Sequence, residues 1–124
     1  MHRVLLVDDN QGLLDVYGSA LEEAGFEVIP LVGAARIIEA TREFEPDLIL
    51  MDIEMPDMDG VEATRRLRAT ADTCRVPVLA LTAKQLPGDV DEALESGCDG
   101  YIVKPLHPEE LVDELAAYLG TLEG

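Results

Sequence analysis

The sequence predicts an α/β fold in which five strands alternate with five helices around one doubly wound parallel sheet, a (βα)5 architecture. Short apolar runs begin at residues 4, 26, 48, 76 and 101. Segments with helical periodicity fill the gaps between these runs and follow the last one. With 124 residues, the chain suits a single domain that buries about two-thirds of its unfolded surface. We therefore expect one three-layer domain without a linker.

Four of the five predicted strands are nearly continuous apolar runs. They span residues 4–7, 48–51, 76–81 and 101–103, which is typical of parallel strands that helices cover on both faces. The remaining strand, residues 26–32, contains Glu27 and Pro30. Because proline has no N–H to donate, it favours an edge strand. An edge second strand and right-handed crossovers together predict the strand order 2-1-3-4-5, the flavodoxin-like order.

Five amphipathic segments predict the helices. Their apolar residues recur every three or four positions within residues 13–24, 34–44, 61–67, 90–94 and 111–122. Gly25 is a typical residue to end the first helix. Pro108 suits the first turn of the last helix, where Glu109 and Glu110 complement the helix dipole. Gly60 is expected in a left-handed or tight-turn position at the entrance to the third helix.

The charge of the chain excludes several classes of function. Asp and Glu number 26 and Lys and Arg number 9, which gives a formal net charge of −17. Such a surface repels phosphate backbones and anionic membranes, so we expect no direct nucleic-acid binding. No apolar run approaches the roughly 20 residues of a membrane helix, so no membrane insertion is expected. Cys74 and Cys98 lack metal-ligand spacing, which favours reduced thiols in a cytoplasmic protein.

Acidic residues follow the two strands between which the predicted strand order reverses, where ligands bind in such sheets. Asp8 and Asp9 follow the first strand, and Asp52 follows the third. Their like charges need a positive partner. Mg²⁺ prefers oxygen ligands, and Lys104, at the end of the fifth strand, adds a second positive charge. The sequence therefore predicts a magnesium site at this edge of the sheet.

Each of these residues also has an ordinary explanation when it is taken alone. Asp8, Asp9 and Asn10 could cap the helix that follows them, and Asp52 could cap a turn. Thr82 could be an ordinary β-branched strand residue, and Lys104 could simply end its strand. Their coincidence at one sheet edge favours a functional site. No glycine-rich nucleotide-binding loop follows the first strand.

Four motifs lie at the predicted carboxyl ends of the strands. They read LVDDN at residues 6–10, DLILMDIEMPDMDG at residues 47–60, LTA at residues 81–83 and YIVKP at residues 101–105. In these motifs the chain resembles the receiver domain of two-component response regulators. The resemblance runs from about residue 3 to about residue 119. It implies that residues 1–124 form a single receiver domain with no output domain.

The resemblance implies a role for each acid. Asp52 resembles the phosphoacceptor of the family. Asp9 and Asp52 would bind Mg²⁺ directly, together with the backbone carbonyl of Glu54. Asp8 would hold a metal-bound water.

The resemblance also implies a switch. Thr82 and Lys104 would contact the incoming phosphoryl group, and Tyr101 matches the switch aromatic of the family. The implied function is a phosphoacceptor in a two-component or phosphorelay system, which catalyses only its own phosphorylation and dephosphorylation. The expected partners are a sensor histidine kinase or histidine phosphotransfer protein and a downstream protein target. The fourth helix, fifth strand and fifth helix would contact that target.

Two questions stay open at the level of the sequence. A phosphorylation-independent interaction scaffold with the same fold is the alternative function. A stand-alone regulator and a receiver cut from a larger protein, such as a hybrid histidine kinase, have the same sequence features.

Overall fold

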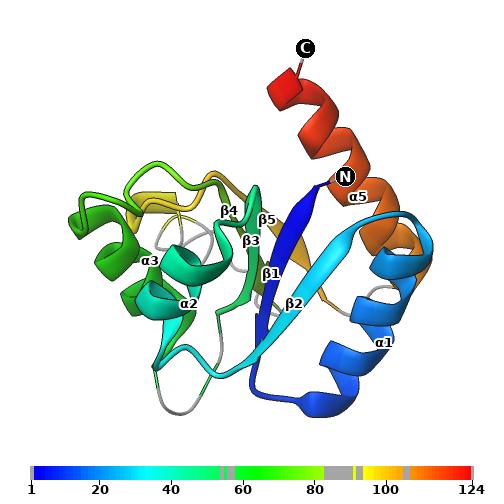
Figure 1. Cartoon of the computed structure of the whole chain (residues 1–124), viewed down its shortest axis with the longest axis horizontal. Helices are drawn as coiled ribbons and strands as arrows, with labels where there is room; N and C mark the ends of the chain where they lie inside the picture. Colours follow the sequence, from blue (N-terminus) through cyan, green and yellow to red (C-terminus); the bar gives the residue numbers. More distant parts are fainter. Residues whose placement is uncertain are drawn as a thin grey trace.

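The computed structural model describes residues 2–53, 55, 58–82, 91, 94–104 and 107–123. Strands and helices alternate along the chain (Figure 1). The elements are β1 (Arg3–Asp8), α1 (Gln11–Glu23), β2 (Glu27–Val32), α2 (Ile37–Phe44), β3 (Leu48–Asp52), α3 (Gly60–Ala69), β4 (Val78–Thr82), β5 (Gly100–Val103) and α5 (Pro108–Glu123). Of the helix predicted at residues 90–94, only Asp91 and Leu94 lie within the described residues.

The five strands form one parallel sheet in the order β2-β1-β3-β4-β5, which confirms the predicted topology. The register aligns the carboxyl ends of the central strands, because Asp52 of β3 pairs with Leu81 of β4. Thr82, the next residue of β4, pairs with Val103 of β5. Polar residues that follow these strands are thus brought to one edge of the sheet.

Strand β2 lies at the edge of the sheet, as Pro30 predicts. The Glu27 amide donates to the His2 carbonyl oxygen at 2.9 Å, on the side of β1. Successive residues of a strand direct their backbone groups to opposite sides, so the nitrogen of Pro30 faces away from β1. The missing N–H therefore costs no hydrogen bond within the sheet.

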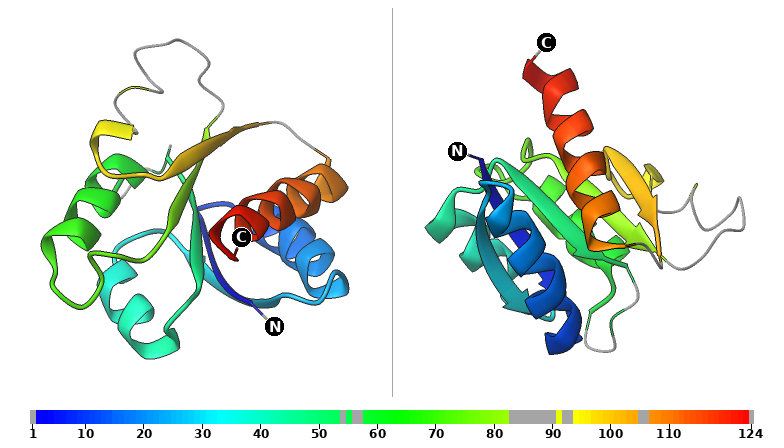
Figure 2. Two further views of the ribbon diagram at one scale, coloured as in Figure 1. Left: turned by 90° about the horizontal axis from the view of Figure 1, so that it is seen from above. Right: turned by 90° about the vertical axis from the view of Figure 1, so that its right-hand side faces the viewer.

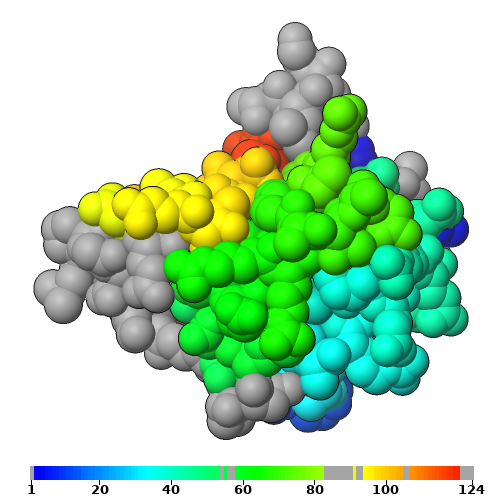
Figure 3. All heavy atoms as spheres, turned by 90° about the vertical axis from the view of Figure 1, so that its left-hand side faces the viewer, coloured from blue at the N-terminus to red at the C-terminus, as the bar shows by residue number. Residues whose placement is uncertain are grey.

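Helices cover both faces of the sheet, with α1 and α5 on one face and α2 and α3 on the other (Figure 2). Figure 3 shows α2 and α3 side by side on the surface of their face. The strands divide their side chains between two apolar cores. The core beneath α1 and α5 includes Val4, Leu6, Leu48, Leu50, Leu81 and Ile102. The core beneath α2 and α3 includes Leu5, Val7, Ile49, Met51, Val78 and Ala80.

The helix boundaries follow local signals in the sequence. Helix α1 ends before Gly25, whose φ of 98° is left-handed, as the glycine predicts. Helix α2 ends at Phe44, and Glu45 takes a left-handed φ of 47° before Pro46. Within the described part of the chain, none of the helices combines the length and apolar character that crossing a bilayer requires.

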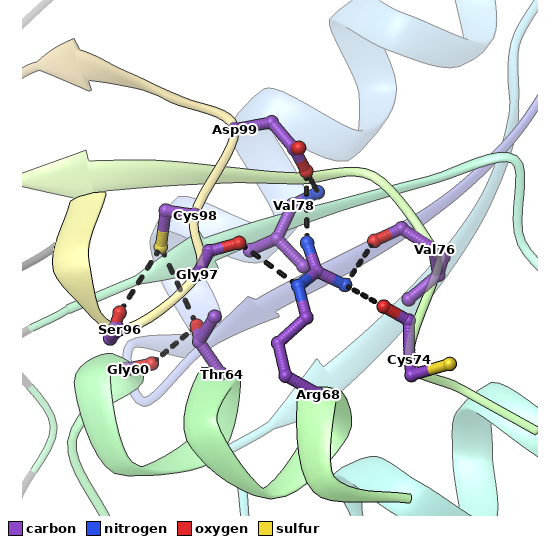
Figure 4. A network of polar contacts seen from close by, with 10 residues as sticks. All are labelled: Gly60, Thr64, Arg68, Cys74, Val76, Val78, Ser96, Gly97, Cys98 and Asp99. Carbon is purple, nitrogen blue, oxygen red and sulfur yellow. Dashed lines mark hydrogen bonds and ion pairs between the residues drawn. The ribbon is translucent and has the colours of Figure 1, made fainter. Parts of the chain in front are cut away.

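The guanidinium of Arg68, in α3, joins several segments at the amino-terminal edge of the sheet (Figure 4). Its Nε donates to the Gly97 carbonyl oxygen at 3.0 Å, and its Nη1 donates to the Val76 carbonyl oxygen at 2.6 Å. Its Nη2 lies 2.9 Å from Asp99 Oδ2, which also accepts from the Val78 amide at 2.8 Å. Strand β4 begins at Val78 and not at the predicted residue 76. The Val76 amide donates to the Thr73 carbonyl oxygen at 3.3 Å within a turn, and the Val76 carbonyl oxygen accepts from Arg68.

Candidate functional site

Strand β1 and the start of α1 position the first two acids. The Asp8 carboxylate is buried, and its Oδ1 accepts from the Asn10 amide at 3.0 Å. Asn10 is the residue that caps α1, because its side chain accepts from the Leu13 amide at 3.2 Å. The capping explanation therefore applies to Asn10 and leaves Asp8 for another role. Asp9, between them, is exposed.

Lys104 joins the ends of three strands. Its ammonium Nζ lies 3.4 Å from Asp8 Oδ2 and 3.3 Å from Asp52 Oδ1. The Lys104 amide donates to the Thr82 carbonyl oxygen at 2.8 Å, which continues the pairing of β5 with β4 beyond Val103. Asp52 is also buried, and only 16% of the Lys104 side chain is exposed. The three charged groups therefore interact in a largely dry environment.

The site carries more negative than positive charge. Carboxylate oxygens of Asp8, Asp9 and Asp52 lie within 4.8 Å of one another, so among the described residues three negative charges face one positive charge, that of Lys104. Burial lowers the pKa of Lys104, but the charges of Asp52 and Asp8 raise the pKa by more, so the net shift is upward and the ammonium stays charged. Hard carboxylate oxygens with two uncompensated charges fit a divalent cation such as Mg²⁺.

The site opens on the side of the sheet that α1 and α5 cover. Leu6 and Leu50 face those helices, and Asp8 and Asp52 each follow two residues later on the same strand. Because side chains two residues apart share a face of a strand, both carboxylates point to that side. The start of α1 follows Asp8 and Asp9 directly and thus borders the site.

The remaining predicted residues lie around this centre at different depths. Thr82 is buried at the end of β4, one residue beyond Leu81, the partner of Asp52 in the sheet. Tyr101 is 45% exposed on β5, three residues before Lys104, and it pairs in the sheet with Ala80 of β4. Glu54, whose carbonyl was expected as a metal ligand, lies outside the described residues.

Gly60 supports the site in a way that the sequence does not reveal. Of the two expected positions, left-handed or tight-turn, the left-handed one is wrong, because Gly60 does not have a positive φ. Its amide donates to the Ile53 carbonyl oxygen at 2.9 Å, which places the start of α3 directly against the end of β3. A β-carbon on Gly60 would lie 2.7 Å from the Asp52 carbonyl oxygen. Only glycine allows this approach without moving the backbone of Asp52.

Comparison with known proteins identifies the class to which this fold and site belong. Residues 4–116 match the family model of the response regulator receiver domain. The chain therefore belongs to the response regulator receiver domain family. A receiver of this kind is a phosphoacceptor module of two-component signalling and not an enzyme that turns over an external substrate.

Several relatives span nearly the whole chain. The polar-differentiation response regulator DivK of Brucella ovis is 33% identical over 117 residues, which are 94% of this chain and 95% of DivK. The chemotaxis protein CheY4 of Vibrio cholerae has a structure that is 30% identical, with a TM-score of 0.88, and the match covers 94% of this chain and 98% of that one.

A third relative bears on the acidic site. The receiver domain of the sensor histidine kinase PA1611 from Pseudomonas aeruginosa PAO1 is 34% identical, with a TM-score of 0.85, and the match covers 96% of this chain and 98% of that one. Its structure has a magnesium ion coordinated in the active-site cleft. The three carboxylates of the present chain are consistent with such a site.

Proposed function

We propose that Asp52 accepts a phosphoryl group from a phosphohistidine and that the chain thereby works as a signalling switch. The observation that carries this proposal is the pair of contacts from Lys104 Nζ, at 3.3 Å to Asp52 and 3.4 Å to Asp8. These contacts hold a cation beside a buried carboxylate at the edge of the sheet where acids from β1 and β3 meet. The donor would be a sensor histidine kinase or a histidine phosphotransfer protein.

The transfer exchanges one bond for another. An oxygen of the Asp52 carboxylate forms a bond to phosphorus as the bond from phosphorus to the histidine nitrogen breaks, and the released imidazole takes up a proton. Lys104 neutralises charge on the oxygens of the transferring group, and the Thr82 hydroxyl, at the end of the neighbouring strand, contacts one of them. Asp8, Asp9, Asp52 and the carbonyl of Glu54 would hold Mg²⁺, which supplies further neutralisation of phosphoryl charge when bound.

The product is an acyl phosphate, which water can cleave to return the Asp52 carboxylate and inorganic phosphate. The signal is therefore reversible without a second enzyme. Because the chain acts on its own side chain, its chemistry is limited to phosphorylation and dephosphorylation of Asp52.

The readout that we propose runs through Thr82 and Tyr101. Movement of the Thr82 hydroxyl toward the phosphoryl group leaves space on the β5 side of the sheet, and Tyr101, which is 45% exposed, rotates into it. This rearrangement changes the surface formed by β5, α5 and the predicted fourth helix, where a downstream protein binds. We further propose that residues 1–124 form one receiver domain and act in the cytoplasm, where the free thiols of Cys74 and Cys98 remain reduced.

The test is the intact mass of the protein after incubation with acetyl phosphate, with and without Mg²⁺. We expect one phosphoryl adduct on the wild type that requires Mg²⁺ and is absent from Asp52→Asn. Asp15→Asn, which removes an exposed acid of α1, is the matched control and should keep the adduct. If the folded wild type forms no adduct with acetyl phosphate or with a phosphorylated kinase, the proposal is wrong and the scaffold function is favoured.

A further inference from the structure

A line of buried polar groups runs from the start of α3 to the turn before β5 (Figure 4). The hydroxyl of Thr64, a fully buried residue, donates to the Gly60 carbonyl oxygen at 2.7 Å. The same hydroxyl oxygen lies 3.5 Å from Cys98 Sγ, and Ser96 Oγ lies 3.8 Å from that sulfur. Cys98 and Ser96 are buried as well. Helix α3 is therefore joined to the segment that leads into β5 by polar contacts that are shielded from water.

The direction of these hydrogen bonds follows from the number of protons. A hydroxyl has one proton to donate and a carbonyl oxygen can only accept, so the Thr64 proton goes to Gly60. The contact between Thr64 and Cys98 then requires the thiol to donate and the hydroxyl oxygen to accept. Cys98 thus favours the orientation in which the Thr64 proton points at the Gly60 carbonyl oxygen.

Gly60 is the residue at which this line of polar groups meets the acidic site. Its amide donates to the Ile53 carbonyl oxygen at 2.9 Å. It also packs so closely on the Asp52 backbone that a β-carbon on Gly60 would lie 2.7 Å from the Asp52 carbonyl oxygen. The bond from Thr64 holds the carbonyl of the same glycine. A shift of Gly60 would therefore move the backbone from which the Asp52 carboxylate projects.

We propose that the Thr64 hydroxyl positions Asp52 through Gly60, and that the Cys98 thiol orients this hydroxyl. Thr64 acts through the backbone of another residue and is a positioning residue, not a catalytic one. The inference rests on the proposed function, because it concerns the placement of the phosphoacceptor. It also adds to the contact with Lys104, which holds the Asp52 carboxylate itself at 3.3 Å.

The alternative is that the Thr64 hydroxyl only finds a partner within its own helix, as buried threonines commonly do. Thr41 of α2 provides this comparison in the same chain. It is also buried, and its hydroxyl donates to the carbonyl oxygen of Ile37, four residues earlier, at 2.7 Å. The two bonds are alike, but Ile37 belongs to the apolar core, whereas Gly60 packs on Asp52.

The experiment removes each hydroxyl from the full chain by a substitution of similar shape, Thr64→Val or Thr41→Val. Each variant loses one buried hydrogen bond of 2.7 Å within a helix, so we expect similar losses of stability in urea. Hydrogen exchange of the Gly60 amide is measured by NMR without a phosphoryl donor or metal. Growth of the phosphoryl adduct is then measured with acetyl phosphate and Mg²⁺.

We expect the Gly60 amide to exchange about tenfold faster in Thr64→Val than in Thr41→Val, because only the first substitution releases Gly60. Phosphorylation of Asp52 should be about three- to tenfold slower in Thr64→Val and should keep the wild-type rate in Thr41→Val. Thr64→Ser keeps the hydroxyl and should restore exchange and rate to within about twofold of the wild type.

A double-mutant cycle tests the role of Cys98. Cys98→Ala removes the thiol and should slow phosphorylation by about twofold in the wild-type background, because a thiol is a weak donor. In the Thr64→Val background the same substitution should leave the rate unchanged, since the hydroxyl through which the thiol acts is gone. Equal slowing in both backgrounds would show that Cys98 acts by packing and not through Thr64.

Three further outcomes would overturn the proposal. Equal exchange of the Gly60 amide in both valine variants would show that the Thr64 hydroxyl does not hold Gly60. Equal slowing of phosphorylation by both would attribute the effect to lost stability, and a Thr64→Ser variant as slow as Thr64→Val would attribute it to the methyl group. The exchange measurement uses no phosphoryl donor, so its result is independent of the adduct that tests the proposed function.

Discussion

The contact between Gly60 and the backbone of Asp52 allows the geometry of the site to be tested by a single methyl group. In Gly60→Ala the new carbon would lie 2.7 Å from the Asp52 carbonyl oxygen and 2.8 Å from Ile53 Cα. Ordinary contacts begin at 3.4 Å, so the start of α3 and the end of β3 must move apart by 0.7 Å. Both of these atoms belong to the backbone, and a side-chain rotation cannot relieve the contact.

The displacement falls on the residue that we propose as the phosphoacceptor. Catalytic groups must be held to within about 0.5 Å, and a misplacement of about 1 Å can cost about 100-fold in rate. We therefore expect Gly60→Ala to slow phosphorylation of Asp52 by roughly 10- to 100-fold. Overpacking should also lower the free energy of unfolding by about 1–3 kcal/mol, which leaves a folded protein to assay.

The rate is measured as growth of the phosphoryl adduct with acetyl phosphate and Mg²⁺, and stability is measured by urea unfolding. Gly120→Ala is the control, because a β-carbon at this position of α5 meets no atom within 4 Å. It should keep the wild-type rate. If folded Gly60→Ala is phosphorylated as fast as the wild type, the close approach of α3 does not position Asp52 and the reasoning is wrong.

Three further predictions concern Lys104, Arg68 and Asp9. Lys104→Gln should slow formation of the adduct by roughly 100-fold, and an unchanged rate would exclude the lysine from the transfer. Arg68→Met removes bonds to Gly97, Val76 and Asp99 and should lower the free energy of unfolding by about 2–4 kcal/mol in urea, whereas Mg²⁺ affinity should stay unchanged. Mg²⁺ at about 100 times its Kd should stabilise the wild type by about 2.7 kcal/mol, as measured by thermal unfolding against a chelator control. Asp9→Asn should lose most of that gain, and equal stabilisation of the variant would place the ion elsewhere.

The features that the sequence predicts well are those that depend on strand order and periodicity. Pro30 identifies the edge strand, and an edge second strand with right-handed crossovers favours the order 2-1-3-4-5. In that order Asp8 and Asp52 end neighbouring parallel strands, so they meet at one edge of the sheet. Lys104 reaches the same edge from β5 because parallel strands share a direction.

The features that the sequence does not predict depend on distances between segments. Arg68 contacts Asp99 across 31 positions of the chain, and nothing in the local pattern of α3 marks it for that role. Gly60 has the residue type of a turn, but its actual constraint is the nearness of the Asp52 backbone. The sequence also does not predict that Asn10 caps α1 while Asp8 contacts Lys104. Aspartate and asparagine cap helices equally well, so either residue could have been the cap.

The Arg68 network lies at the opposite end of the sheet from Lys104, and this arrangement gives β4 and β5 one anchored end. One guanidinium holds the carbonyls before β4 and β5, and the Asp99 carboxylate holds the first amide of β4. If the Thr82 hydroxyl moves as proposed, these bonds would hold the amino ends of β4 and β5 in place. We therefore expect the displacement to be largest at the carboxyl edge of the sheet, on the side of the acidic site, and smallest near Val78.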